Sequence, residues 1–187
     1  MDALLKSTKS NARGIPEAPF VEKVEDFIKD PNDFDLCFNK FQERLSKYKY
    51  MQESKLLTVK QLKQKIPEIE NTLNMCHALK KQQERGRNLE TNYQLNETLY
   101  TTAEIDTSQE LKVGLWLGAD VMLEYPIDEA ISLLNEKLAD GKKNLEVNQE
   151  DVEYLRENIT TMEVNCARLY NWDVEKRQQL KLAQQKA

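Results

Sequence analysis

Two long apolar stripes, with steps that alternate between four and three residues, restrict the possible folds of this sequence more than any other feature. The first stripe runs from Phe34 to Cys76, and its only polar members are Gln52 and Lys55. Its positions are Phe34, Phe38, Phe41, Leu45, Tyr48, Gln52, Lys55, Val59, Leu62, Ile66, Ile69, Leu73 and Cys76. A heptad stripe sustained over so many turns is typical of a coiled coil and not of a helix in a globular domain.

The second stripe, from Ile127 to Leu169, has the same spacing and is weakest at Gly141 and Asn148. Its positions are Ile127, Ile131, Leu134, Leu138, Gly141, Leu145, Asn148, Val152, Leu155, Ile159, Met162, Cys166 and Leu169. Each helix would have roughly 50 residues and a length of about 75 Å. Because the lengths match, the predicted fold is mainly α, a long antiparallel coiled-coil hairpin with both chain termini at its open end.

The first coiled-coil helix is predicted over residues 33–86. Asn32 or Asp33 can serve as its N-cap, and Gly86 stands where a C′ glycine ends a helix. Pro67 interrupts this helix, and a proline inside a helix costs roughly 3 kcal/mol. Since the stripe continues in phase on both sides, we expect a kink or a local break rather than two unrelated helices.

The second coiled-coil helix is predicted over residues 126–182. The fixed φ angle of Pro126 suits a first helical turn. Asp128 and Glu129 complement the positive end of the helix dipole. The returning helix is therefore expected to begin directly after the central segment.

The N-terminal region is predicted to have two parts. Residues 1–19 contain one glycine and two prolines with few apolar side chains, and we expect them to be a mobile tail. Residues 20–30 carry apolar side chains at helical spacing, which predicts a short amphipathic helix. This helix should end before Pro31, because the residue before a proline avoids the α region.

Residues 87–125 differ in composition from the segments on either side. They are rich in Thr, Tyr, Leu and Val, as in the stretch LKVGLWLGADVMLEYP that begins at Leu111, and this composition favours strands. Turns are expected at Asn96-Glu97, at residues 106–109 and at Gly118-Ala119-Asp120. We predict two consecutive β-hairpins at the closed end of the coiled coil, with strands near residues 89–95, 98–105, 110–117 and 121–125.

Two hairpins of this size bury little surface and are marginally stable alone. Their unpaired edges and apolar faces favour pairing with another chain. We therefore interpret the segment as an oligomerisation module. The alternative is that the hairpins fold back and pack only on their own coiled coil.

Composition argues against several other classes of protein. The 187 residues are 32% charged, with a mean hydropathy of -0.73 and a net charge of -5, so no basic surface for nucleic acid is expected. No apolar run approaches the ~20 residues of a membrane span, and we expect no signal peptide. Cys37, Cys76, Cys166 and the single histidine His77 form no metal-binding motif and favour a reducing, intracellular setting. A rod offers no catalytic cleft and the glycines form no phosphate-binding motif, so neither a cofactor nor enzymatic activity is predicted.

Four phrases resemble a known family. LWLGADVMLEYPIDEAISLL resembles the strand-to-helix signature of α-class prefoldin subunits, and the match becomes closer at GIPEAPFVEKVEDF, KIPEIENTL and TTMEVNCARLYNWDV. The resemblance covers Gly14 to Lys176. It implies one prefoldin-type domain over residues 20–187, in a hetero-hexamer of two α-class and four β-class subunits whose hairpins build a double β-barrel. It further implies an ATP-independent chaperone of the cytoplasm that captures unfolded actin and tubulin near the helix ends and passes them to the cytosolic chaperonin.

The resemblance also implies two sets of site residues. The assembly surface would comprise Leu99, Tyr100, Val113, Gly114, Leu115, Trp116, Leu117, Gly118, Val121, Met122 and Leu123. The client surface would comprise Phe20, Val21, Phe27, Phe34, Phe38, Leu169, Tyr170 and Trp172. The two glycines of the first set would allow bulges or a close backbone approach.

Several alternatives stay open. We expect Trp172 to pack on Phe34 or Phe38 across the helix ends rather than to contact a client. Residues 20–28 could fold onto the coiled coil or stay free for clients. A structural tether or spacer with a β-mediated dimer interface is the alternative function. A coiled-coil tRNA-binding arm is disfavoured by the acidic balance of the chain.

Overall fold

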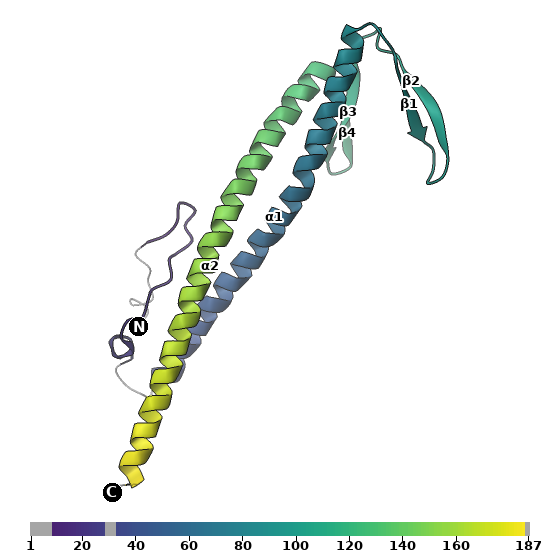
Figure 1. The fold of residues 1–187 in the computed structure, drawn as a ribbon. Coiled ribbons are helices and arrows are strands. Elements are labelled where there is room, and N and C mark those ends of the chain that lie inside the picture. The colour runs from purple at the N-terminus through teal and green to yellow at the C-terminus, as the bar shows by residue number, and fades with distance from the viewer. Residues whose placement is uncertain (1–8, 29–32, 186–187) are drawn as a thin grey trace. The chain divides into compact units, whose positions relative to one another are not determined.

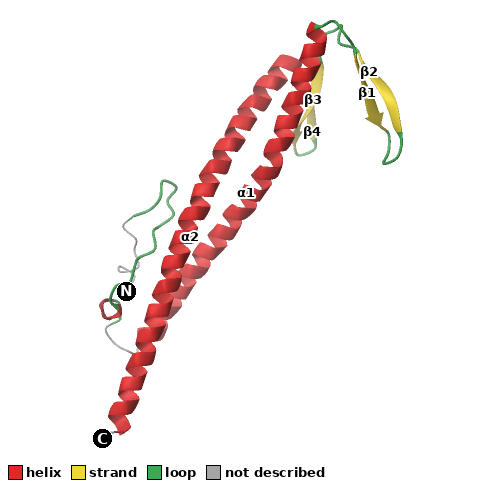
Figure 2. Ribbon diagram, in the orientation of Figure 1, coloured by secondary structure: helices red, strands yellow, loops and turns green. Residues whose placement is uncertain are grey.

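The computed structural model describes residues 9–28 and 33–185. Figures 1 and 2 show two long α-helices and two β-hairpins in the described part, which confirms the predicted fold class. In chain order the elements are the 3₁₀ turn η1 (Val24–Asp26), α1 (Phe34–Glu84), β1 (Leu89–Gln94), β2 (Tyr100–Ile105), β3 (Lys112–Gly118), β4 (Val121–Pro126) and α2 (Ile127–Gln185). The described residues of Met1–Val59 and Val147–Ala187 form one compact unit, and Lys60–Glu146 form the other, so each unit contains a part of both helices.

Both predicted heptad stripes lie in the interior of the helix pairs. Phe41 and Tyr48 of the first stripe are fully buried, as are Leu155, Met162 and Leu169 of the second. Every other member of either stripe is buried or half-buried. Removing apolar surface from water contributes roughly 25 cal/mol per Å². The apolar stripes are therefore the main contact between the two helices within each unit.

Ion pairs flank the apolar contact in both units. Lys49 Nζ lies 2.7 Å from Glu163 Oε1 in the first unit, and Lys142 Nζ lies 2.7 Å from Glu70 Oε1 in the second. All four side chains are largely exposed to water, so each pair contributes less than about 1 kcal/mol. Their role is to select which residues of the two helices face each other.

Pro67 lies inside α1, and the helix continues through it. Ile66 beside it is buried, and a Cβ atom on Gly141 of α2 would lie 3.5 Å from Ile66 Cγ1. Contacts with the facing helix thus continue directly beside the proline. They offset the lost hydrogen bond, and the local break that the sequence allowed is not observed.

A Schellman motif ends α1 at Gly86. The Gly86 N–H donates to the Gln83 carbonyl over 2.9 Å, and the Arg87 N–H donates to the Gln82 carbonyl over 3.2 Å. Gly86 has a φ angle of +61°, which glycine adopts without a Cβ clash. The predicted C′ glycine is confirmed.

The four strands form two antiparallel hairpins, each a separate two-stranded sheet. β1 pairs with β2 from Leu89 opposite Ile105 to Gln94 opposite Tyr100. β3 pairs with β4, and its register shifts by one residue at Leu117. Every strand of these sheets therefore keeps one unpaired edge.

The N-terminal region departs from both predictions made for it. Residues 9–19, expected to be mobile, pack on the helices of the first unit and bury Ile15 and Ala18. Residues 20–28, expected to be helical, contain only the turn η1. Side chains of α1 and α2 bind the main chain at Pro16, Ala18, Pro19 and Val21, in place of the hydrogen bonds that a helix would provide there. The parts of these predictions at residues 1–8 and 29–32, including the N-cap at Asn32, lie outside the described residues.

Candidate functional site

Exposed apolar side chains follow the two hairpins. Trp116 on β3 is 68% exposed, Met122 opposite it on β4 is 49% exposed, and Tyr100 on β2 is 56% exposed. Leu99, Leu117, Val121 and Leu123 are between 45% and 53% exposed. Exposed apolar residues and free sheet edges are features typical of interaction surfaces. We call these seven residues the hairpin apolar row.

Two of the predicted assembly residues face inward instead. Leu115 is buried, and Val113 packs beside the small core formed by Cys76, Leu111 and Ile127. Successive side chains of a strand point to opposite faces. One face of β3 therefore attaches the hairpin to the helices, whereas the other face presents Trp116 to solvent.

The two glycines of the predicted assembly surface have different roles. A Cβ atom on Gly114 would lie 2.9 Å from Met122 Sδ, so glycine lets the methionine lie across the strand. Gly118, with a φ angle of +106°, leads into a turn in which Ala119 and Asp120 have φ angles of +49° and +58°. Two successive positive φ values are typical of the type I′ turn that matches strand twist.

An open cavity of about 620 Å³ lies beside β3 within the second unit. Its lining includes Ile69 of α1, Leu133 and Leu134 of α2, and Trp116. Trp116 borders this cavity and still exposes most of its surface, so the helices of its own chain do not enclose the ring. Of the β3 residues that line the cavity, Leu115 is buried, whereas Trp116 and Leu117 stay about half exposed or more.

Six of the eight predicted client-binding residues are buried or half-buried within the chain itself. Val21 and Leu169 are fully buried, and Phe34 is 6% exposed. Phe27 and Phe38 are half-buried against the same core. Within this set, the largest exposures belong to Phe20 at 52% and Tyr170 at 58%.

Trp172, the last of the predicted client residues, is half-buried and packs against the core of the first unit. Its Nε1 donates a hydrogen bond to Glu25 Oε1 over 2.9 Å. Lys176 Nζ lies 5.8 Å from the centre of its ring. The side chain thus connects α2 to the N-terminal region, which is the kind of structural role that the sequence favoured.

The N-terminal strap, residues 9–28, lies beside α2 in the first unit (Figure 1). Buried side chains recur along it at every third residue, at Ile15, Ala18, Val21 and Val24. A period of three residues fits an extended polyproline II-like chain for the first three, whereas Val24 begins the 3₁₀ turn η1. These side chains share one apolar core with both helices, which includes Phe41, Tyr48, Leu155, Ile159, Met162 and Leu169.

Two asparagines of α2, one heptad apart, bind the main chain of the strap. Asn158 Oδ1 accepts the N–H of Ala18. Asn165 Oδ1 accepts the N–H of Val21 over 2.9 Å, and its Nδ2 donates to the carbonyl of Pro19 over 2.6 Å. Both asparagine side chains are buried. One amide side chain thus pairs with a donor and an acceptor of the same extended segment.

Two further side chains complete these main-chain contacts. The Tyr48 hydroxyl of α1 donates to the carbonyl of Pro16 over 2.9 Å. Arg168 Nη1 of α2 donates to the carbonyl of Val21 over 2.9 Å. Buried main-chain groups need such partners, and here side chains from both helices supply them.

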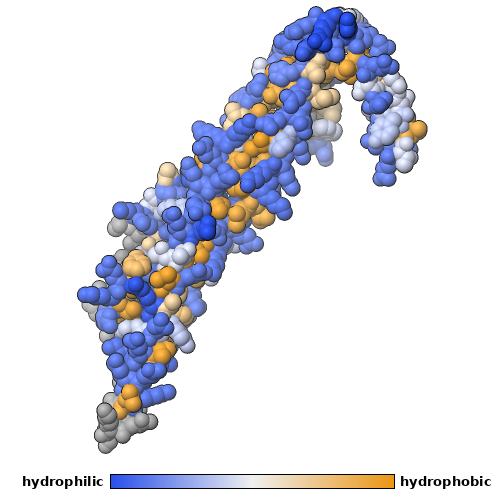
Figure 3. Space-filling view, in the orientation of Figure 1, coloured by the Kyte–Doolittle hydropathy of each residue, from blue (hydrophilic) through white to orange (hydrophobic). Residues whose placement is uncertain are grey.

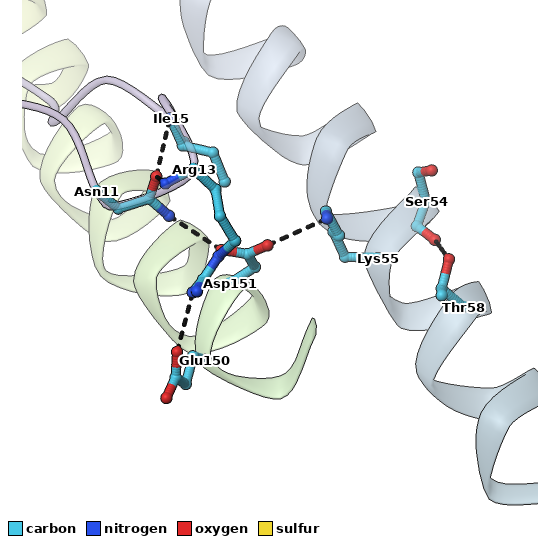
Figure 4. A network of polar contacts seen from close by, with 8 residues as sticks. All are labelled: Asn11, Arg13, Ile15, Ser54, Lys55, Thr58, Glu150 and Asp151. Carbon is cyan, nitrogen blue, oxygen red and sulfur yellow. Dashed lines mark hydrogen bonds and ion pairs between the residues drawn. The ribbon is translucent and has the colours of Figure 1, made fainter. Parts of the chain in front are cut away.

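Asp151 of α2 fastens the beginning of the strap (Figure 4). Its fully buried carboxylate accepts hydrogen bonds from Asn11 Nδ2, over 2.9 Å, and from Arg13 Nε, and its second oxygen lies 3.0 Å from Lys55 Nζ of α1. Burial is the largest single influence on the pKa of Asp151 and opposes ionisation. The hydrogen bond from Arg13 and the ion pair with Lys55 together outweigh it, and the pKa lies below its ordinary value. An ionised Asp151 therefore joins the strap to both helices.

Sequence reasoning did not identify Asp151, Asn158 or Asn165. Together with Trp172 they occupy one position in each of four successive heptads, and the three polar residues stand directly before the stripe members Val152, Ile159 and Cys166. Coiled coils usually carry Glu or Lys at this flanking position. A recurrent short polar residue there was the available signal that this face of α2 is covered.

Other kinds of chemical site receive no support from the described residues. They contain no group of three or more His, Cys, Asp or Glu placed to hold a metal ion. Burial raises the pKa of the thiols of Cys37, Cys76 and Cys166. No helix in the described part combines the length and apolar character needed to cross a membrane.

Comparison with known proteins identifies the class. Residues 48–172 match the family model described as prefoldin subunit. Given this match and the arrangement of long helices and two hairpins, the chain belongs to the prefoldin family. Its members are chaperone subunits and not enzymes.

The chain is also similar to individual members of that family. The chain is 65% identical to prefoldin subunit 3 of Saccharomyces cerevisiae, over 99% of this chain and 96% of the relative. It is 45% identical to human prefoldin subunit 3, over 88% of this chain and 83% of the relative. It is 37% identical to prefoldin subunit 3 of Drosophila melanogaster, over 93% of this chain and 88% of the relative. The chain is therefore a prefoldin co-chaperone subunit that associates with other prefoldin subunits, and it is similar to eukaryotic prefoldin subunit 3.

Proposed function

We propose that this chain is an α-class subunit of a hetero-hexameric, ATP-independent prefoldin chaperone in the cytoplasm. In that particle it captures unfolded actin and tubulin chains near the ends of its helices and passes them to the cytosolic chaperonin. The observation that carries the proposal is the hairpin apolar row, with Trp116 68% exposed on a sheet that has free edges. Its similarity to prefoldin subunit 3 of several eukaryotes supports the same function.

Assembly would occur through these hairpins. A two-stranded sheet leaves half of its main-chain donors and acceptors unpaired with another strand, and closure with strands of neighbouring subunits removes the edges. Burying one large apolar side chain contributes roughly 1.5–3 kcal/mol. The seven side chains of the hairpin apolar row are 45–68% exposed, so assembly would bury the remaining part of each and contribute a corresponding share of this free energy.

Client capture would use apolar surface of the first unit. Phe20 and Tyr170 are more than half exposed there, and the Arg168 guanidinium lies 4.8 Å from the centre of the Phe20 ring. Figure 3 shows apolar residues in discontinuous patches on a mostly hydrophilic helical surface. Such patches suit weak contacts with many unfolded sequences, which expose apolar side chains in no fixed order.

Assembly and capture can be tested on the same preparation. The full chain is coexpressed with one α-class partner and β-class partners, and native mass spectrometry measures the particle. We expect two α-class and four β-class subunits. Light scattering then follows the aggregation of unfolded actin, which the particle should suppress without ATP. A stable monomer that ignores the partners would contradict the proposal, and a defined homodimer without effect on actin would favour a structural spacer.

A further inference from the structure

We propose that the groove that holds the N-terminal strap is an exchangeable binding site for extended apolar chain segments, and that the strap is its resident competitor. For its biological role this inference rests on the proposed function, since a segment of an unfolded client is the ligand that would replace the strap. The groove lies within the first unit. Parts of α1 and α2 form it, with Tyr48 on one side and Asn158, Asn165 and Arg168 on the other.

The polar contacts in the middle of the groove recognise main chain and not side chains. Asn158 and Asn165 accept the N–H groups of Ala18 and Val21, and Asn165 also donates to the carbonyl of Pro19. Any residue other than proline offers the same N–H, and every residue offers the same carbonyl. A segment of different sequence in the same extended conformation can therefore make the same hydrogen bonds.

The apolar contacts define the class of ligand. Side chains at Ile15, Ala18, Val21 and Val24, three residues apart, enter the core of the first unit, and each is at most 8% exposed. The residues between them, such as Pro16 and Glu22, are exposed, except for the half-buried Pro19. The groove thus accepts an extended segment with a small or branched apolar residue at every third position and tolerates varied residues between. Apolar segments of unfolded chains satisfy this requirement often.

Contacts that depend on strap side chains concentrate at the two ends of the strap. Asn11 and Arg13 bind Asp151 near its beginning, and Glu25 accepts the hydrogen bond from Trp172 near its end. Residues 17–23 of the strap belong to no helix or strand, so this part can leave the groove without disrupting a secondary-structure element. As part of the chain, it has a high effective concentration at the groove and excludes weak ligands until they compete with it.

The test uses the full chain and a labelled peptide with the sequence of residues 9–28. Val21→Asp places a charge in the core position of the strap, which should displace it and leave the groove open. Lys23→Asp introduces the same side chain at an exposed position of the strap and is the matched control. Fluorescence anisotropy measures peptide binding. We expect the Val21→Asp chain to bind the peptide at least tenfold more tightly than the wild-type and Lys23→Asp chains.

A second strap variant and a groove variant keep this result interpretable. Ala18→Pro removes the N–H that Asn158 accepts and adds no charge, and it should also increase peptide affinity. Adding Asn165→Ala to Val21→Asp should abolish the gain. Circular dichroism checks that every variant keeps its helix content. Equal affinity for the wild-type, Val21→Asp and Ala18→Pro chains would overturn the proposal.

Competition identifies the ligand class. An unlabelled peptide of unrelated sequence with Val or Ala at every third position should displace the labelled peptide, whereas one with Lys at those positions should not. If only the strap sequence binds, the groove is a specific intramolecular site, and the proposal is wrong. Suppression of actin aggregation without any peptide binding would leave the proposed function intact and refute the groove. Peptide binding without suppression of actin aggregation would support the groove and contradict the proposed function.

Discussion

Asp151 shows how a single residue can connect three segments of one chain. Its carboxylate contacts Asn11 and Arg13 of the strap and Lys55 of α1, although it belongs to α2. A buried carboxylate without partners would be protonated or excluded from the core. The network therefore makes the ionised state of Asp151 and the attached state of the strap depend on each other.

Asp151→Asn should lower the free energy of unfolding by about 1–2 kcal/mol at pH 7, because a charged hydrogen-bond acceptor is lost while Arg13 and Lys55 remain partly solvated. The pKa of Asp151 is lowered by folding, so its contribution is fully present above the ordinary value near 3.8. It is lost as the pH falls through the lower, folded-state pKa. Urea unfolding of both proteins from pH 7 to acid should show a constant difference that shrinks only below about pH 4. A difference that disappears already at pH 6 would contradict this assignment.

Asn165→Ala removes the acceptor of the Val21 N–H and the donor to the Pro19 carbonyl. We expect a loss of about 1–3 kcal/mol in the stability of the attached strap, since buried polar groups are left unsatisfied. The Val21 amide should then exchange its hydrogen faster, by the factor that corresponds to this loss of free energy. The exposed Asn171→Ala on the same helix is the control and should leave this exchange rate unchanged.

At the scale of elements, periodicity accounts for most of what is observed. The heptad stripes identified α1 and α2 and their buried faces, and the glycine at 86 located the end of α1. The strand-like composition of residues 87–125 predicted four strands, which the structure has at β1 to β4. Patterns of this kind are readable because they reflect the local geometry of helix and strand, which needs no knowledge of distant residues.

Pro67→Ala is the sharpest test at this scale. The proline is exposed within a continuous helix, so alanine should restore a main-chain hydrogen bond without disturbing the core. We expect the free energy of unfolding to rise by about 1–2 kcal/mol, less than the full penalty because the unfolded chain gains entropy. Thermal unfolding followed by circular dichroism measures it. No gain would mean that α1 is already distorted around this residue in a way that alanine cannot relax.

For the whole molecule, the proposed assembly depends on side chains that the isolated chain leaves exposed. Trp116 and Leu115 are neighbours on β3, but only Leu115 is buried by the chain's own helices. From the sequence alone, both belonged to the same predicted surface. The register of β3 against β4 separates them, and a shift by one residue would exchange their roles.

Trp116→Asp should therefore abolish entry into a six-subunit particle, because a charge would be buried in the interface at a cost of several kcal/mol. Helix content should stay unchanged, since the side chain is 68% exposed in the chain alone. Trp172→Ala, which alters the core of the first unit, is the comparison and should leave assembly intact. Native mass spectrometry of coexpressed subunits distinguishes these outcomes. Normal assembly of the Trp116→Asp chain would place the interface elsewhere.

The amino-acid sequence was sufficient for the two helices, their apolar faces and the two hairpins, because each is set by contacts between residues at short, regular spacing. It was not sufficient for the N-terminal strap. Residues 20–28 have helical spacing, and yet they form no helix beyond the short turn η1, because Asn165 and Arg168 bind the main chain of Val21, as Asn158 binds that of Ala18 just before it. These partners lie more than 130 residues away in the chain, and only the folded structure places them along one groove.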